Sequence, residues 1–115
     1  MANQLTIYFT SDTHGYLYPS HFCDQQPRPM GLLSMRFPKD GNTLIIDGGD
    51  TIQGSPLTNL YQRLSPEEKA ACLTEDTYGT HPIAAMMNLA GYQFVTLGNH
   101  DFNYGVDALT ERWCA

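Results

Sequence analysis

Three short polar clusters hold the side chains of this sequence that could do chemistry together. They occupy residues 11–15, 47–50 and 98–101. Each cluster follows a run of apolar and β-branched residues, at 5–9, 43–46 and 94–97. The clusters contain Asp, His and Asn, whose oxygen and nitrogen atoms suit hard and borderline divalent metals. Because ligands of open α/β sheets bind beyond the carboxyl ends of the strands, we expect the clusters to converge on one metal-binding pocket.

Taken singly, the clusters differ in how specifically they indicate a metal site. Asp12 and His14 stand beside a glycine, a setting in which both residue types commonly form turns. The segment 48–50 has the same turn-forming interpretation, and Asp47 could either cap the end of its strand or orient a metal ligand. The segment 98–101 is more specific, because neighbouring ligand or proton-transfer side chains directly after a buried strand rarely serve packing. The three clusters in this order predict metal binding.

The elements that must position the clusters follow an α/β order. Strands are predicted at about 4–10, 43–47 and 93–97, and the first is almost continuously apolar, as expected for a strand covered on both faces. Helices are predicted between and after them, with one or two short turns near 32–37. This order predicts a mostly parallel sheet of three strands with right-handed crossover helices.

Local signals mark where the helices begin and end. Ser55 before a proline, and Ser65 with Glu68 three residues later, are typical of helix N-termini, the second as a capping box. The second helix is expected to end near Leu73, before a polar loop at 74–80. Further helices are expected from Pro82 to a glycine stop at Gly91, and over 106–113.

Composition excludes several function classes. The formal net charge is -6, with only six Lys and Arg, which argues against a nucleic-acid polymer as partner. No apolar run is long enough to cross a membrane. The three cysteines lack Cys-x-x-Cys spacing, so neither a disulfide framework nor a zinc knuckle is indicated. Glycine loops lack the Gly-Lys-Ser/Thr of a P-loop, and no nucleophile lies in a strand-to-helix elbow. Without a leader-like start we expect a cytoplasmic protein, although an exported protein with its signal removed would look the same.

The clusters and their flanks resemble a known family. Residues 9–15 (FTSDTHG), 48–57 (GGDTIQGSPL) and 96–105 (TLGNHDFNYG) are similar to the amino-terminal part of the calcineurin-like metallophosphoesterases. The resemblance is closest to the branch of 5'-nucleotidases and 2',3'-cyclic-nucleotide 2'-phosphodiesterases, and His81-Pro82-Ile83 looks more like the cyclic-phosphodiesterase side. It implies a four-layer α-β-β-α sandwich, of which residues 1–115 would form the amino-terminal part of one catalytic domain.

The resemblance also implies a role for each site residue. Asp12 and His14 would bind a first divalent metal, Asp50 would bridge two metals, and Asn99 would ligate the second. The metals would be two of Mn, Zn, Mg, Co or Fe. His100 would stabilise the transition state or protonate the leaving oxygen, and we place Asp101 beside it in the catalytic set as the nearest acid.

Two departures from the family pattern bear on function. Many 5'-nucleotidases of this branch have an Asp three residues after the catalytic His, where this chain has Asn103. The family also completes its metal site with later histidines, one isolated and one pair spaced His-x-His. Only His21, in a loop where it could contact substrate or be merely structural, and His81, a surface or helix-capping residue, remain here. We therefore expect an amino-terminal fragment that lacks the carboxy-terminal part of its own domain and exposes an apolar sheet face.

The sequence thus predicts a metallophosphoesterase that acts on a nucleotide or other small phosphoester. A 2',3'-cyclic-nucleotide 2'-phosphodiesterase or nucleotidase is the leading interpretation. A 5'-nucleotidase, or an inactive fragment that binds metal weakly, is the alternative.

Overall fold

The computed structural model describes residues 3–21, 23–71 and 81–113. In these residues the order of strands, α-helices and 3-10 helices (η) is β1 (Thr6–Thr10), η1 (Leu32–Ser34), β2 (Thr43–Asp47), α1 (Pro56–Arg63), α2 (Pro66–Ala71), α3 (Pro82–Ala90), β3 (Phe94–Val95), η3 (Asn99–Phe102) and α4 (Val106–Trp113). The predicted end of the second helix near Leu73 and the polar loop at 74–80 lie outside the described residues.

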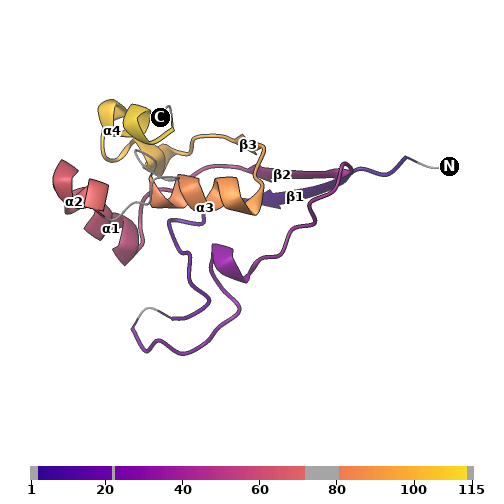
Figure 1. Cartoon of the computed structure of the whole chain (residues 1–115), viewed down its shortest axis with the longest axis horizontal. Coiled ribbons are helices and arrows are strands. Elements are labelled where there is room, and N and C mark those ends of the chain that lie inside the picture. Colours follow the sequence, from indigo (N-terminus) through magenta and orange to yellow (C-terminus); the bar gives the residue numbers. More distant parts are fainter. Residues whose placement is uncertain (1–2, 22, 72–80, 114–115) are drawn as a thin grey trace.

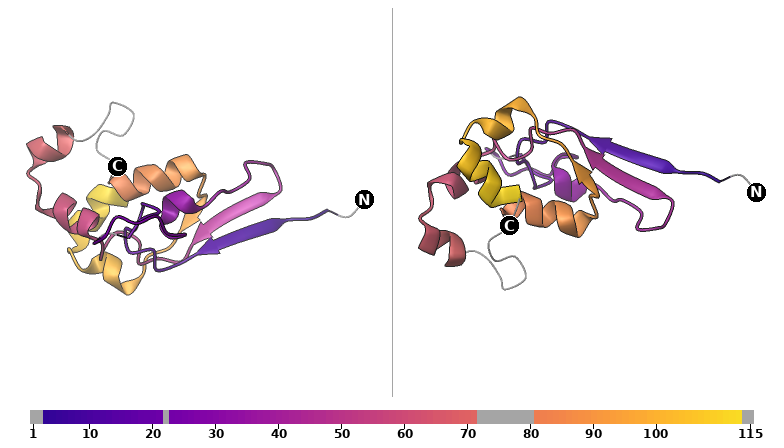
Figure 2. Two further views of the ribbon diagram at one scale, coloured as in Figure 1. Left: turned by 90° about the horizontal axis from the view of Figure 1, so that it is seen from below. Right: turned by 90° about the horizontal axis from the view of Figure 1, so that it is seen from above.

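The three strands form one parallel sheet in the order β1-β2-β3, which confirms the predicted α/β class. β1 and β2 pair in register from Thr6 opposite Thr43 to Thr10 opposite Asp47. All four α-helices lie toward the carboxyl ends of β1 and β2, with α3 nearest the strands and α1, α2 and α4 farther from the N-terminus (Figure 1; Figure 2). The three polar clusters, which follow the carboxyl ends of these strands, therefore lie at the same end of the sheet.

The local helix signals are confirmed. The Ser55 hydroxyl accepts a hydrogen bond from Thr58 N at 3.2 Å and caps α1. Ser65 and Glu68 form the predicted capping box, with bonds of 2.8 and 3.2 Å between side chains and backbone N–H groups. Gly91 ends α3 in the left-handed conformation, with φ 92°. These ends depend on neighbouring residues only, which is why the sequence shows them.

The third strand is shorter than the predicted 93–97. The side chain of Gln93 accepts a hydrogen bond from Ile45 N at 2.8 Å, so it takes the place of a strand carbonyl. The ladder consequently begins at Phe94 and covers two residues. After Thr96, whose N–H still bonds to the Asp47 carbonyl, the chain turns into η3.

One face of the sheet is apolar and exposed. Leu5, Ile7, Phe9 and Phe94 are between 56% and 65% exposed, and Phe9 and Phe94 flank Ile46 in the sheet. The prediction that the first strand is covered on both faces is therefore wrong for the described residues. The exposed apolar face expected of a sheet without its partner layer is present instead.

The core lies on the other face. Its buried members come from the loop after β1, from η1, from the loop after β2 and from α3 and α4: Leu17, Leu32, Ile52, Ile83, Met87 and Leu109. Met87 is 2% exposed, and Met86 packs against this core. In the part of the chain that the structure describes, no helix combines the length and the apolar character that crossing a membrane requires.

Candidate metal centre

The loop after β1 presents Asp12 and His14 toward the loop after β2. Both residues have left-handed backbone angles, with φ 56° and 49°, which side-chain-bearing residues adopt infrequently. Their N–H groups donate to the carbonyls of Gly49 at 3.0 Å and Asp50 at 2.9 Å. These bonds continue the pairing of β1 and β2 past the strand ends. The first and second clusters are thus joined through their backbones.

The ring of His14 is oriented for binding through Nε2. Its Nδ1 lies 2.7 Å from the carbonyl oxygen of Gln53. Because a carbonyl only accepts, Nδ1 carries the hydrogen and Nε2 keeps its lone pair in the neutral imidazole. Such a carbonyl partner on the second ring nitrogen is the usual way in which metal-binding histidines are held. The geometry therefore suits His14 to ligation.

Asp12, His14 and Asp50 form a group whose potential ligand atoms lie within 4.8 Å of one another. His14 Nε2 and Asp12 Oδ1 are 3.9 Å apart. A cation held at roughly 2.1 Å by each of two atoms joins atoms up to about 4.2 Å apart, so this pair can share one ion without rearrangement. Two carboxylates and an imidazole suit Zn, Mn, Co or Fe. The donor set fits a divalent metal.

Asp50 is the most enclosed member of this group. It is 7% exposed, whereas the side chain of Asp12 is 64% exposed. One carboxylate oxygen of Asp50 accepts a hydrogen bond from His100 N at 2.7 Å. The backbone of Asp50 is left-handed as well, with φ 57°. Asp50 therefore lies between the first cluster and the third.

The third cluster brings His100 next to His14. Their ring centroids are 5.5 Å apart in an edge-on arrangement. The Nδ1 atom of His100 lies 3.1 Å from the side-chain amide nitrogen of Asn103, so Asn103 holds the imidazole. Asn99 begins η3 and is exposed at the same turn. The predicted site residues of all three clusters thus lie in one region.

Asp101 differs from the other predicted site residues in its orientation. It is fully buried, and its two carboxylate oxygens accept hydrogen bonds from four backbone N–H groups, those of Asp50, Thr51, Ile52 and Gly98, at 2.8 to 3.1 Å. These bonds direct the carboxylate into the loop backbone. The structure therefore places Asp101 as a backbone acceptor, and the expected catalytic part for it remains a prediction without a contact in support.

Asp47 is the buried end of a polar chain beneath the site, which continues through the half-buried Thr10 and Tyr92. Its carboxylate accepts from Gly49 N at 2.8 Å and from the Thr10 hydroxyl at 2.6 Å, and Thr10 is bonded to the Tyr92 hydroxyl at 2.8 Å. Burial raises the pKa of Asp47 above its usual range, and it raises the pKa of Tyr92 as well. Sequence reasoning left Asp47 open between two roles and missed Thr10 and Tyr92. Thr10 is the register partner of Asp47 in β1, so the predicted strand pairing could have identified it.

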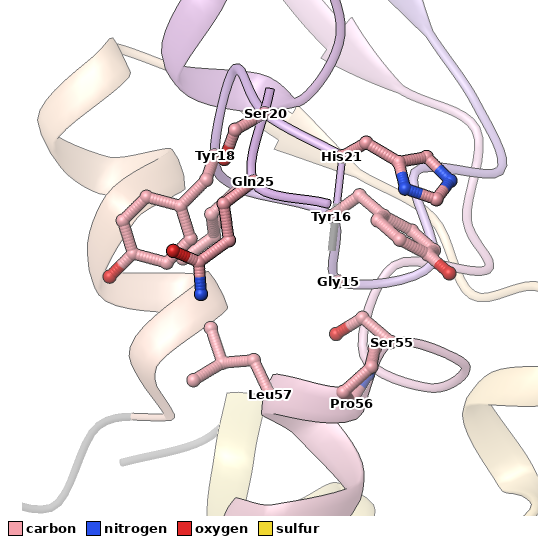
Figure 3. A pocket seen from close by; sticks show the side chains of 10 residues that line it. Gly15, Tyr16, Tyr18, Ser20, His21, Gln25, Ser55, Pro56 and Leu57 are labelled. Carbon is pink, nitrogen blue, oxygen red and sulfur yellow. The ribbon is translucent and has the colours of Figure 1, made fainter. Parts of the chain in front are cut away.

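A pocket of about 230 Å³ opens beside the site, between the loop after β1 and the start of α1 (Figure 3). His21 and Tyr16 lie on one side of it, and Tyr18 lies on the other. The His21 ring accepts from Cys23 N at 3.2 Å and lies 3.6 Å from Asp24, so its contacts are local to its loop. His81 is buried at the start of α3, where it caps Ile83 N at 3.2 Å. The capping interpretation of His81 is confirmed, and its surface placement is wrong.

The fold and the donor set agree with one family. Residues 5–114 match the sequence profile of the calcineurin-like phosphoesterases, and the chain belongs to this family. The structure superposes on the crystal structure of calcineurin-like phosphoesterase YfkN from Bacillus subtilis with a TM-score of 0.71 and 32% identity. That superposition covers 93% of this chain and 33% of the other. The family predicted from the sequence is confirmed.

Relatives of both predicted branches are found at similar identity. The trifunctional nucleotide phosphoesterase protein YfkN of Bacillus subtilis is 34% identical over 112 residues, which are 91% of this chain and 7% of that protein. The 2',3'-cyclic-nucleotide 2'-phosphodiesterase/3'-nucleotidase of Haemophilus influenzae is 28% identical, over 93% of this chain and 16% of that protein. Human 5'-nucleotidase is 30% identical, over 96% of this chain and 18% of that protein. The chain thus spans less than a fifth of each of these relatives.

Proposed function

We propose that the protein containing this chain hydrolyses nucleotide phosphoesters at a centre of two divalent metal ions. The observation that carries the proposal is the convergence of Asp12, His14 and Asp50, with His100 beside His14. Two bound cations would polarise the phosphoryl group and supply a hydroxide for in-line attack. The sheet and its three loops provide the fixed geometry that such chemistry requires.

Each candidate site residue has its own task in this proposal. Asp12 and His14 would hold the first metal, and the hydrogen bond from His14 Nδ1 to Gln53 keeps Nε2 available for it. Asp50 would be shared by both metals, because a carboxylate has two oxygens and a charge that would screen the cations from each other. Asn99 would offer a neutral amide oxygen to the second metal. His100, beside His14, would donate a proton toward the substrate oxygens.

Cyclic nucleotides are the favoured substrates. Asn103 occupies the place of the Asp that orients the catalytic histidine in many 5'-nucleotidases, and its amide contacts His100. An amide holds the ring but stabilises its cation less than a carboxylate does. The names of the relatives include both 2',3'-cyclic-nucleotide phosphodiesterases and 5'-nucleotidases, so 5'-nucleotidase activity is the second candidate. The third candidate is an inactive protein that binds metal weakly and hydrolyses no phosphoester.

The test is a metal-dependent assay on the complete polypeptide that contains this chain. Manganese-dependent hydrolysis of 2',3'-cyclic AMP is compared with release of phosphate from AMP, and we expect the cyclic substrate to be preferred. Asp50→Asn should abolish turnover, whereas Glu67→Gln, a charge-neutralising change at an exposed position on α2, should preserve it. Preference for AMP would favour the 5'-nucleotidase. Failure to turn over either substrate with Mn, Zn, Mg, Co or Fe would refute the proposal that the protein is an enzyme for these substrates. Residues 1–115 alone are expected to show little activity.

A further inference from the structure

Asp101 has a fully buried carboxylate in the site region, and the proposed chemistry does not use it. It is 0% exposed, and no lysine or arginine contacts it among the interactions of the described residues. A buried carboxylate without a cation is costly unless hydrogen bonds satisfy it. Here Oδ2 accepts from Asp50 N at 2.8 Å and Oδ1 accepts from Thr51 N and Ile52 N at 3.0 and 3.1 Å. The carboxylate is thus satisfied entirely by backbone.

Three consecutive N–H groups need these bonds because the chain has left the sheet. β2 ends at Asp47, and the segment from Asp50 to Ile52 belongs to neither strand nor helix. Thr51 and Ile52 are fully buried, so their N–H groups would be costly without a partner. The Asp101 carboxylate supplies the acceptors that a neighbouring strand would otherwise give. It holds the loop in the conformation that carries Asp50.

The support is reciprocal. Asp101 receives N–H groups from the loop after β2, while the Asp50 carboxylate receives the N–H of His100 at 2.7 Å from the turn that carries Asp101. Both residues therefore bind the backbone of the other's loop. The loops also approach closely, since a side-chain carbon added at Gly98 would lie 2.2 Å from Asp50 Oδ1. This contact leaves Asp50 little freedom to move.

We infer that Asp101 is a positioning residue that sets the backbone of Asp50 before any metal binds. The inference rests on the metal centre of the proposed function, but not on hydrolysis. It assigns the carboxylate a role in metal affinity. Removing an outer partner of a metal ligand typically lowers metal affinity by about 10- to 100-fold.

Binding of Co²⁺ to the complete polypeptide tests the inference, with affinity from calorimetry and coordination from the visible absorption spectrum. Asp101→Asn keeps the size of the side chain but turns one acceptor into a donor that faces backbone N–H groups. We expect about 10- to 100-fold weaker binding and an altered spectrum, with partial recovery in Asp101→Glu. Ile83→Val, in the core on α3, is the control for lost stability and should leave both readouts unchanged. Wild-type affinity and spectrum in Asp101→Asn would overturn the inference.

Amide hydrogen exchange of the unaltered protein tests the same point and does not require a variant to fold. In chelator, the N–H groups of Asp50, Thr51 and Ile52 should already be protected, and adding Co²⁺ should change their exchange little. Free exchange of these groups without metal would show that the metal builds the loop and would refute the role of Asp101. Because neither measurement involves turnover, an intact Asp101 effect in a protein that hydrolyses no nucleotide would separate this inference from the proposed function.

Discussion

Replacing Gly98 by alanine should damage the metal centre through one added methyl group. Gly98 has an ordinary extended backbone, with φ -90° and ψ 175°, so an alanine there suffers no conformational strain. The added carbon would however lie 2.2 Å from Asp50 Oδ1, 2.5 Å from its Cγ and 2.6 Å from its N. Side chain and backbone of Asp50 are both in the way. The substitution therefore isolates the packing of one loop against Asp50, the proposed bridging ligand.

The size of the effect follows from the overlap. Real side-chain carbons essentially never come closer than 3.0 Å to such atoms, so the added carbon and the carboxylate oxygen must move apart by at least 3.0 − 2.2 = 0.8 Å. Overpacking of this kind costs about 1–3 kcal/mol of unfolding free energy. A displacement of about 1 Å in a catalytic group can lower the rate by about 100-fold. We expect a loss of this order in kcat/KM for Gly98→Ala.

The assay compares kcat/KM of the manganese-loaded complete polypeptide with its unfolding free energy. Gly41→Ala is the matched control, because an added carbon there meets no atom within 4 Å and the backbone is not left-handed. The control should retain both activity and stability. Gly98→Ala with a kcat/KM within about threefold of the wild type would refute the reasoning, since the loops would then be loose enough to absorb the overlap.

Three further predictions concern the buried chain, the helix cap and the first metal. Asp47 has a raised pKa, so its folded form binds a proton more tightly than the unfolded chain does, and stability from this group falls as pH rises above 3.8. In chelator, Asp47→Asn should reduce the decrease in unfolding free energy between pH 4 and 7, measured by urea unfolding. An unchanged pH dependence of the unfolding free energy would contradict the assignment. Ser55→Ala removes the cap of α1 and should lower the unfolding free energy by about 0.5–2 kcal/mol, measured by urea unfolding, and no loss would show that the cap contributes nothing. His14→Ala removes the imidazole ligand and should weaken Co²⁺ binding in calorimetry more than Asp101→Asn does, whereas equal binding to the wild type would exclude His14 as a ligand.

Elements fixed by neighbouring residues were predictable from the sequence. The cap at Ser55 and the stop at Gly91 depend on residues within one helical turn, and both appear where predicted. The three-stranded parallel sheet was predictable as well, because apolar runs alternate with helical segments along the chain. The short third strand was not, since its start is set by the Gln93 side chain reaching Ile45, a residue 48 positions earlier.

The candidate site could be predicted in composition but not in orientation. The sequence places His100 and Asp101 side by side, yet one contacts His14 and the other turns into the backbone of the loop after β2. A 3-10 turn separates their directions, and the sequence carries no clear signal for that turn. The left-handed backbone of Asp12 and His14 was equally hidden, because both residues are fixed by hydrogen bonds to the loop after β2.

The candidate metal ligands are thus held less by the strands than by one another's loops. Asp12 N and His14 N donate to carbonyls of the second cluster, and Asp50 and the third cluster exchange hydrogen bonds from backbone N–H groups to carboxylates. Each loop supplies polar partners that the next one lacks after its strand ends, and this satisfies buried groups that would otherwise be costly. The same bonds bring acidic side chains close together despite their repulsion. A divalent cation would relieve that repulsion, so the hydrogen-bonded loops and the metal should stabilise each other.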